Sequence, residues 1–220
     1  GASTNVIHSE ATVQHLYPAL VKLPNGRIQC FYLVFDGSAN LCQVSMHYSD
    51  DHGNSWKRGS RYVLDAAIST STYTPKRLRV AAGPGQHALV IWSSKTADEV
   101  LHHYASDDRG STFSEVATWT GNAGQRGGNH DLLYAGGGFL LAYSDPDTQV
   151  GPTDGRGTKF GRIASAFTSF LDAGTAVPKN RAGSDLSLVY PSANVGSGTR
   201  LFDDWDQCLA VTDVGAVCWY

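Results

Sequence analysis

The chain has 220 residues, 41% of them hydrophobic, which is enough to bury a core of its own. Its 17 lysines and arginines against 20 aspartates and glutamates give a net charge of −3, and no segment concentrates basic residues, which argues against a nucleic-acid partner. No run of about 18 apolar residues is present, which argues against membrane insertion. We expect a single domain over residues 1–220. This domain could be the C-terminal head of a longer protein.

Short runs rich in β-branched and aromatic residues are separated throughout by Gly, Pro, Asn and Asp, the pattern of antiparallel strands joined by turns. LPNGRI at 23–28 and AAGPGQ at 81–86 carry the residues that tight hairpin turns prefer. No amphipathic helix of ten residues is evident, so the chain is predicted to be all-β. The expected strands, in chain order, are 17–23, 27–35, 43–49, 61–66, 77–83, 87–94, 99–106, 113–119, 131–137, 139–145, 159–167, 185–190, 208–213 and 216–220.

One short segment occurs twice. YSDDHGNSW at 48–56 returns as ASDDRGSTF at 105–113, 57 residues later, each time with expected strands before and after it. A third unit fits residues 131–176 without the Asp and Gly. Each repeat holds four antiparallel strands, as one blade of a β-propeller does, and the length allows a small β-propeller of about four blades. The repeated positions are Ser49, Asp51, Gly53, Trp56 and then Ser106, Asp108, Gly110, Phe113.

These residue types suit a sharp reversal between two strands. A glycine accepts the positive φ that a Cβ would oppose. Aspartate and serine side chains bond to the backbone of their own turn, and the aromatic residue closes the turn by packing on the sheet. We therefore interpret the acids of both segments as structural rather than catalytic.

The two hairpins resemble the Asp-boxes, or bacterial neuraminidase repeats, of sialidases and related propellers. YPALVKLPNGRI at 17–28 also resembles the first inner-strand region of such proteins. The resemblance implies a propeller with the boxes on its outer rim and ligands at its centre. It implies the fold more specifically than the function, because hydrolases, lectins, receptors and viral spikes all carry this motif.

The chain departs from what a sialidase resemblance implies about catalysis, namely three arginines that grip the substrate carboxylate, a Tyr nucleophile with a Glu partner, and an Asp acid/base. In HLYP at 15–18, Leu16 takes the place of the first arginine. The only glutamates are Glu10, Glu99 and Glu115, and the last two fall in expected outer strands. Hydrolysis of sialosides is therefore not expected.

From these departures we expect a non-enzymatic protein that recognises a glycan or a cell-surface receptor. It would be a lectin-like protein or the head of a viral or phage spike or tail fibre. We expect it to be extracellular or on a virion surface, with a homo-oligomer as one possible assembly. The alternative is a sialidase-like glycoside hydrolase that works through a carboxylate pair, with Asp131 and Asp204 as the candidates. A third hypothesis is a purely structural interaction module.

The candidate ligand contacts lie at the starts of expected inner strands and in connecting loops. Trp205, flanked by acids, could stack on a sugar while Asp204 accepts hydroxyl hydrogen bonds; the alternative is packing between blades. His130 and Asp131 are neighbours in a strand, so they are expected to point to opposite faces. The full set is Tyr17, Arg77, His130, Asp131, Asp204 and Trp205.

No cofactor is required by this interpretation, but calcium is a candidate. The polar segment 144–157 carries Asp145, Asp147 and Asp154, whose carboxylates are hard oxygen ligands; the alternative is a solvated loop.

The four cysteines fall in two pairs, each spanning an expected hairpin, and none has zinc-site spacing. Two hairpin disulfides and four buried thiols remain equally open. The pairs are Cys30 with Cys42 and Cys208 with Cys218.

Overall fold

A computed structural model of the chain describes residues 13–95, 98–120, 130–135, 138–145, 157–163, 170–172, 208–212 and 215–219. Within these ranges every regular element is a β-strand, which confirms the all-β prediction. No helix long and apolar enough to cross a membrane is present in the same ranges.

Most strands coincide with the expected runs to within three residues at either end. Their bounds are β1 Gln14–Lys22, β2 Ile28–Asp36, β3 Leu41–Ser49, β4 Lys57–Arg58, β5 Ile68–Ser69, β6 Thr74–Ala82, β7 His87–Lys95, β8 Asp98–Ser106, β9 Ser114–Thr120, β10 His130–Ala135, β11 Gly138–Asp145, β12 Gly157–Ile163, β13 Phe170–Asp172, β14 Cys208–Thr212 and β15 Gly215–Trp219.

The strands form successive antiparallel sheets, each built from neighbours in the sequence. The first sheet has the order β1-β2-β3-β4, with β5 also paired to β3, and the next two are β6-β7-β8-β9 and β10-β11-β12-β13. β14 and β15 pair as a hairpin. The third unit expected at 131–176 is thus a four-stranded sheet, and the repeat of four strands is the unit of a propeller blade.

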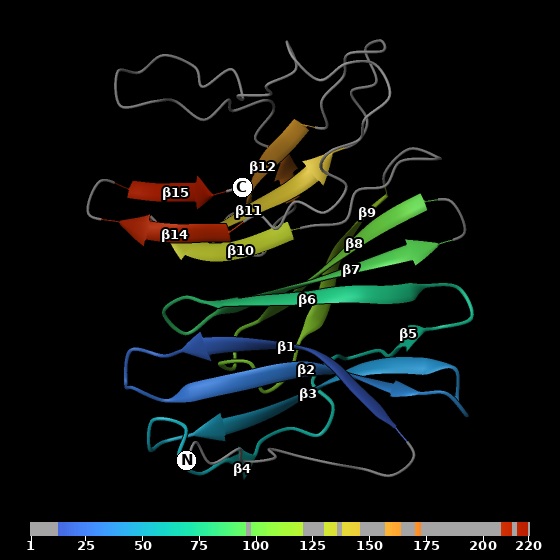
Figure 1. Cartoon of the computed structure of the whole chain (residues 1–220), viewed down its shortest axis with the longest axis horizontal. Helices are drawn as coiled ribbons and strands as arrows, with labels where there is room; N and C mark the ends of the chain where they lie inside the picture. The colour runs from blue at the N-terminus through green and yellow to red at the C-terminus, as the bar shows by residue number, and fades with distance from the viewer. Residues whose placement is uncertain are drawn as a thin grey trace, which may run out of the picture.

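The first strand of each sheet lies beside the first strand of the next. β1 contacts β6, β6 contacts β10, and β10 contacts β14. Figure 1 shows these four strands side by side and running in the same direction, while the other strands of each sheet fan away from them. We call these four the inner strands; their beginnings gather at one end of the array.

The core lies between consecutive sheets, and β2 and β7, the second strands of the first two sheets, contribute buried residues from both faces. In β7, Leu89 and Ile91 belong to the cluster shared with the first sheet, whereas Val90 belongs to the cluster shared with the third. Because both faces are buried, β2 and β7 have almost unbroken apolar sequences instead of alternation. Because such a strand packs on both sides, it holds the sheets on either side of it in position relative to one another.

The predicted strand at 61–66 is wrong. The segment runs beside β3, with Val63 N donating to Val44 O at 2.8 Å, but Leu64 meets a side chain instead of a backbone ladder. The Gln43 carboxamide accepts from Leu64 N at 3.0 Å and donates to Leu64 O at 3.1 Å. Beyond it, Phe113 N donates to Val63 O and Asp65 N to Phe113 O, so the segment ties the first sheet to the second repeated hairpin.

Cys30 and Cys42 are free, buried thiols. They are not opposite each other, since Cys30 pairs with His47 and Cys42 with Phe35 in the β2–β3 register. Burial raises the pKa of Cys30 to about 11 and of Cys42 to about 12. The thiol alternative therefore holds for this pair; the side chains of Cys208 and Cys218 lie outside the described set.

Candidate functional site

The first repeated hairpin is closed by its own side chains. Ser49 Oγ accepts from Gly53 N at 2.8 Å and donates to Asp51 Oδ1 at 2.7 Å. Asp51 also accepts from Ser55 N at 2.8 Å. Gly53 has φ +91°, as the turn requires, and Trp56 Nε1 donates to Gly53 O at 3.1 Å. The hydroxyl and amide of Ser55, then the hydroxyl of Ser49, lower the pKa of Asp51 to about 2.

The second hairpin repeats this arrangement. Ser106 Oγ accepts from Gly110 N at 2.9 Å, and Asp108 accepts from Thr112 N at 2.9 Å and Thr112 Oγ1 at 2.7 Å. Burial alone would raise the pKa of Asp108, but the bonds from Thr112 and then Ser106 outweigh it, so the pKa is lowered. Both carboxylates accept hydrogen bonds from their own turns, as the structural interpretation of this motif expects.

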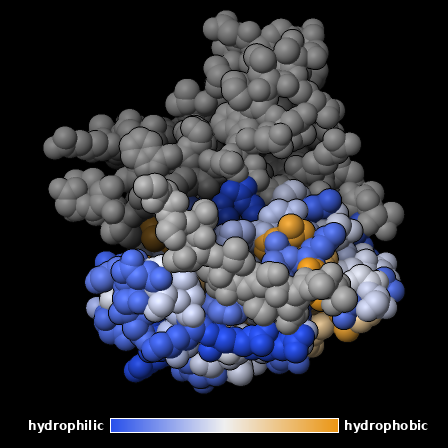
Figure 2. Space-filling view, turned by 60° about the horizontal axis from the view of Figure 1, so that its bottom comes forward, coloured by the Kyte–Doolittle hydropathy of each residue, from blue (hydrophilic) through white to orange (hydrophobic). Residues whose placement is uncertain are grey.

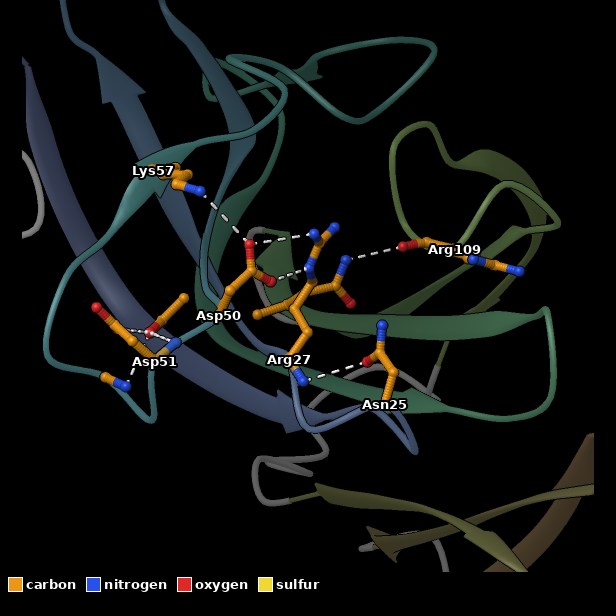
Figure 3. Close-up of polar contacts among 9 residues, drawn as sticks. Asn25, Arg27, Asp50, Asp51, Lys57 and Arg109 are labelled. Carbon is orange, nitrogen blue, oxygen red and sulfur yellow. Dashed lines mark hydrogen bonds and ion pairs between the residues drawn. The ribbon is translucent and has the colours of Figure 1, made fainter.

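Asp50, the other acid of the first hairpin, is also engaged, as Figure 3 shows. It accepts from Arg27 Nε at 2.7 Å and lies 3.6 Å from Lys57 Nζ. The guanidinium of Arg27 stacks over Tyr48 at 4.2 Å from the ring centre. The hydrogen bond from Arg27 is the main cause that lowers the pKa of Asp50. This exposed cluster joins the turn after β1 to the hairpin after β3 and leaves Asp50 committed to partners in the fold.

The inner strands provide the clearest candidate for a ligand site. Arg79 of β6 and Asp131 of β10 form an ion pair at 3.2 Å between Nε and Oδ1, with side chains 27% and 16% exposed. The two residues come from different sheets and meet because their strands are neighbours in the array. Both side chains remain partly accessible, so a polar ligand over the inner strands would find a carboxylate and a guanidinium together.

His130 lies directly before Asp131 but points the other way. Its ring is fully buried, and Nε2 bonds to Val90 O of β7 at 3.1 Å. Burial lowers the pKa of His130 to about 3. The hydrogen bond to Val90 O opposes this shift, and the charges of Arg79 and then Arg77 add smaller contributions that lower the pKa. Of the expected neighbouring pair, His130 is thus the one that packs. A neutral, buried ring does not contact a ligand on the surface, so we remove His130 from the candidate ligand contacts.

Tyr17 and Arg77 occupy the early halves of β1 and β6, at the same end of the inner array. Tyr17 is 39% exposed and follows Leu16, which is 37% exposed. Arg77 is half-buried and lies two positions before Arg79, on the same face of β6. Tyr17, Arg77 and Asp131 therefore sit on three adjacent strands.

Several predicted site residues lie outside the described set, namely Asp147, Asp154, Asp204 and Trp205; Asp145 ends β11, with its side chain also outside that set. Among the residues that the structure describes, no group of three or more His, Cys, Asp or Glu side chains could hold a metal ion. The calcium site stays a prediction.

One polar cluster was not evident from the sequence. His102 of β8 bonds through Nε2 to Ser93 Oγ at 2.8 Å, and its Nδ1 lies 3.6 Å from Glu115 Oε1. The order of groups is that of a nucleophile, a base and an acid, but Ser93 is 0% exposed and no substrate reaches it. The cluster therefore fastens β7, β8 and β9 together. Its members lie 9 and 13 residues apart on three consecutive strands and share no motif, so strand register brings them together.

No family model and no curated protein matches the chain. Among solved structures, it is similar to the α-L-arabinanase of Penicillium chrysogenum complexed with arabinobiose, with 24% identity, 71% of this chain and 47% of that chain covered, and a TM-score of 0.52. It is also similar to the GH93 α-L-arabinofuranosidase of Fusarium graminearum with arabinobiose, with 16% identity, 73% and 49% covered, and a TM-score of 0.53. The chain spans about half the length of these proteins.

At these identities the similarity establishes the fold, which is of the β-propeller type. The number of blades stays a prediction. The expectation of a non-enzymatic recognition head is contradicted, because these similar structures are an arabinanase and α-L-arabinofuranosidases.

Proposed function

We propose that the chain carries a glycoside hydrolase site on its inner strands and acts on α-L-arabinosides. The Asp131–Arg79 pair is the observation that carries the proposal, because it presents a partly exposed carboxylate on the strands where a propeller of this type can bind a ligand. The similar structures, an arabinanase and an α-L-arabinofuranosidase each with arabinobiose, supply the proposed substrate class.

Hydrolysis of a glycosidic bond requires two carboxyl groups, about 5 Å apart for retention and about 6.5–9.5 Å apart for inversion. We assign Asp131 the role of general base or nucleophile, since an ion-paired carboxylate offers its oxygens as acceptors. Arg79 fixes the orientation of that carboxylate. Asp204 is the proposed second carboxyl group, and Trp205 beside it is a proposed sugar contact. Arg77 extends the polar surface along β6.

Other details remain proposals of the same kind. The two closed hairpins have the hydrogen bonding that an Asp-box explains, which supports membership in a sialidase-like propeller group. The partner is proposed to be a glycan, and the site of action to be extracellular.

The test is hydrolysis of 4-nitrophenyl α-L-arabinofuranoside and of arabinan, within a wider panel of chromogenic glycosides. We expect turnover by the wild-type chain and a loss of at least about 100-fold in kcat for Asp131→Asn, because the substitution removes the basic oxygen at similar size. Circular dichroism confirms that the variant is folded.

Asp107→Asn is the matched control, because Asp107 is an exposed acid in the second hairpin turn. It should retain wild-type kcat. The absence of turnover on every glycoside of the panel, or an unchanged kcat for Asp131→Asn, would contradict the proposal.

A further inference from the structure

Tyr17 has a backbone conformation that stands apart within the described ranges. Its φ is +55°, and the other non-glycine residues with positive φ there, Asn40, His52 and Arg109, lie in turns. Tyr17 lies inside β1 and is followed by Pro18, which restricts a preceding residue to extended conformations. A bulky residue held in the left-handed region costs on the order of 1–3 kcal/mol, which the surrounding structure must offset.

The strain is associated with a local irregularity of β1. The register against β2 shifts between Leu16 and Ala19, so Tyr17 and Pro18 form a bulge opposite the regular strand. Bulges change the direction in which a side chain points. Core packing does not explain this one, because the Tyr17 side chain remains 39% exposed while Ala19 and Val21 supply the buried contacts of β1.

Two exposed apolar side chains lie near the bulge on β1. Leu16 is 37% exposed and Leu20 64% exposed on the same strand. In the view of Figure 2 most of the described surface is hydrophilic, and the larger hydrophobic areas lie on the right of that view. The neighbouring inner strand β6 carries Arg77 and Arg79, and Asp131 follows on β10. An aromatic ring beside charged hydrogen-bonding groups is the arrangement that binds a sugar, whose C–H face stacks while its hydroxyls bond.

We propose that Tyr17 is a stacking platform for a neutral sugar residue of the substrate, and that the β1 bulge holds its ring in position for that purpose. This role for Tyr17 rests on the proposed glycosidase function. In that function, Tyr17 would determine the affinity for a sugar residue near the reacting bond. Tyr17 acts through its ring face, so its hydroxyl is dispensable.

The experiment compares Tyr17→Phe, Tyr17→Ala and Tyr17→Gly with the wild-type chain, using arabinobiose as the probe for saturation-transfer NMR and arabinan for kinetics. We expect Tyr17→Phe to bind within about twofold of wild type and both smaller variants to bind about 10-fold more weakly, with KM raised and kcat little changed. Tyr17→Gly should melt about 2 °C above Tyr17→Ala, because only glycine accepts the positive φ without strain.

Tyr62→Ala is the matched control: Tyr62 is 46% exposed and lies in the segment beside β3, away from the inner strands. It should leave KM and arabinobiose binding unchanged. Equal effects of Tyr17→Ala and Tyr62→Ala, with wild-type turnover intact, would overturn the platform and leave the proposed function standing. Arabinobiose binding that depends on Tyr17 without any turnover would support the platform and overturn the hydrolase. A Tyr17→Gly variant no more stable than Tyr17→Ala would overturn the role of the strained bulge.

Discussion

At the scale of single residues, the paired acids that most resemble a catalytic site in the sequence stabilise their own turns instead. Asp51 and Asp108 each accept bonds from a serine two residues earlier and from a Ser or Thr four residues later. Carboxylates that accept from the amides and hydroxyls of their own turn are held in place there. Asp131, the candidate catalytic carboxylate, has no motif around it, and its side chain is 16% exposed.

Removal of a turn-stabilising carboxylate should destabilise the fold. Asp108→Ala leaves the backbone N–H groups of Ser111 and Thr112 without their carboxylate acceptor, and we expect a loss of about 2–3 kcal/mol in the free energy of unfolding. Urea unfolding followed by tryptophan fluorescence measures it. Asp107→Ala, at the exposed neighbouring acid, should keep the wild-type urea midpoint. Equal urea midpoints for the two variants would contradict a structural role for Asp108.

At the scale of elements, the second hairpin turn is docked onto the first sheet. A Cβ on Gly110 would lie 2.8 Å from Phe31 Cζ, and the Phe31 and Phe113 rings meet edge to face at 5.8 Å. Gln29 bridges the same boundary, bonding to His87 Nε2 at 2.9 Å and donating to Arg109 O at 2.9 Å. The hairpin therefore closes its own turn and also packs against the first sheet.

Two glycines with the same backbone separate these roles. Gly53 and Gly110 have φ of +91° and +83°, but the nearest atom to a Cβ on Gly53 is Trp56 Cζ2 at 4.0 Å. We expect Gly53→Ala to cost about 1–2 kcal/mol from backbone strain alone, and Gly110→Ala to cost about 1–3 kcal/mol more because the methyl group meets Phe31. Urea unfolding of both variants tests this, and equal losses would show that the second turn is not docked.

At the scale of the whole molecule, buried histidines lie between and within the sheets. Among the described residues, His87, His103 and His130 have ring nitrogens without a hydrogen-bond partner, and each side chain is at most 3% exposed. Burial lowers the pKa of His87 and His103 to about 4 and of His130 to about 3. The fold thus depends on these rings staying neutral.

Stability should therefore fall on mild acidification. These three histidines have native pKa values near 3–4 and an unfolded pKa near 6.5, so the unfolded chain binds protons first as the pH falls. Their contribution to stability is therefore complete above pH 6.5 and is lost as the pH drops toward 4. The free energy of unfolding should fall by up to roughly 4 kcal/mol per pH unit for the three groups together. Urea midpoints from pH 7.5 to 4.5 measure the slope. His103→Leu should flatten it and His52→Gln, at an exposed position, should not; a slope unchanged by His103→Leu would contradict this account.

The sequence by itself determined the strands and the turns, because period, turn residues and a repeated hairpin are local signals that neighbouring residues carry. It identified Tyr17, Arg77 and Asp131 as candidates but not their arrangement, and it missed that Gln43 interrupts the expected strand at 61–66. That residues 1–220 form one domain stays a prediction.

Only the tertiary structure decided which way each inner-strand residue points and what it meets. Arg79 and Asp131 are 52 residues apart and come together because two sheets place their first strands side by side. The burial of His130 behind Asp131, and the exposure of Tyr17 on a strained bulge, likewise depend on packing between sheets. Contacts of this kind leave no pattern in the chain, because each depends on the register of strands that are distant in sequence.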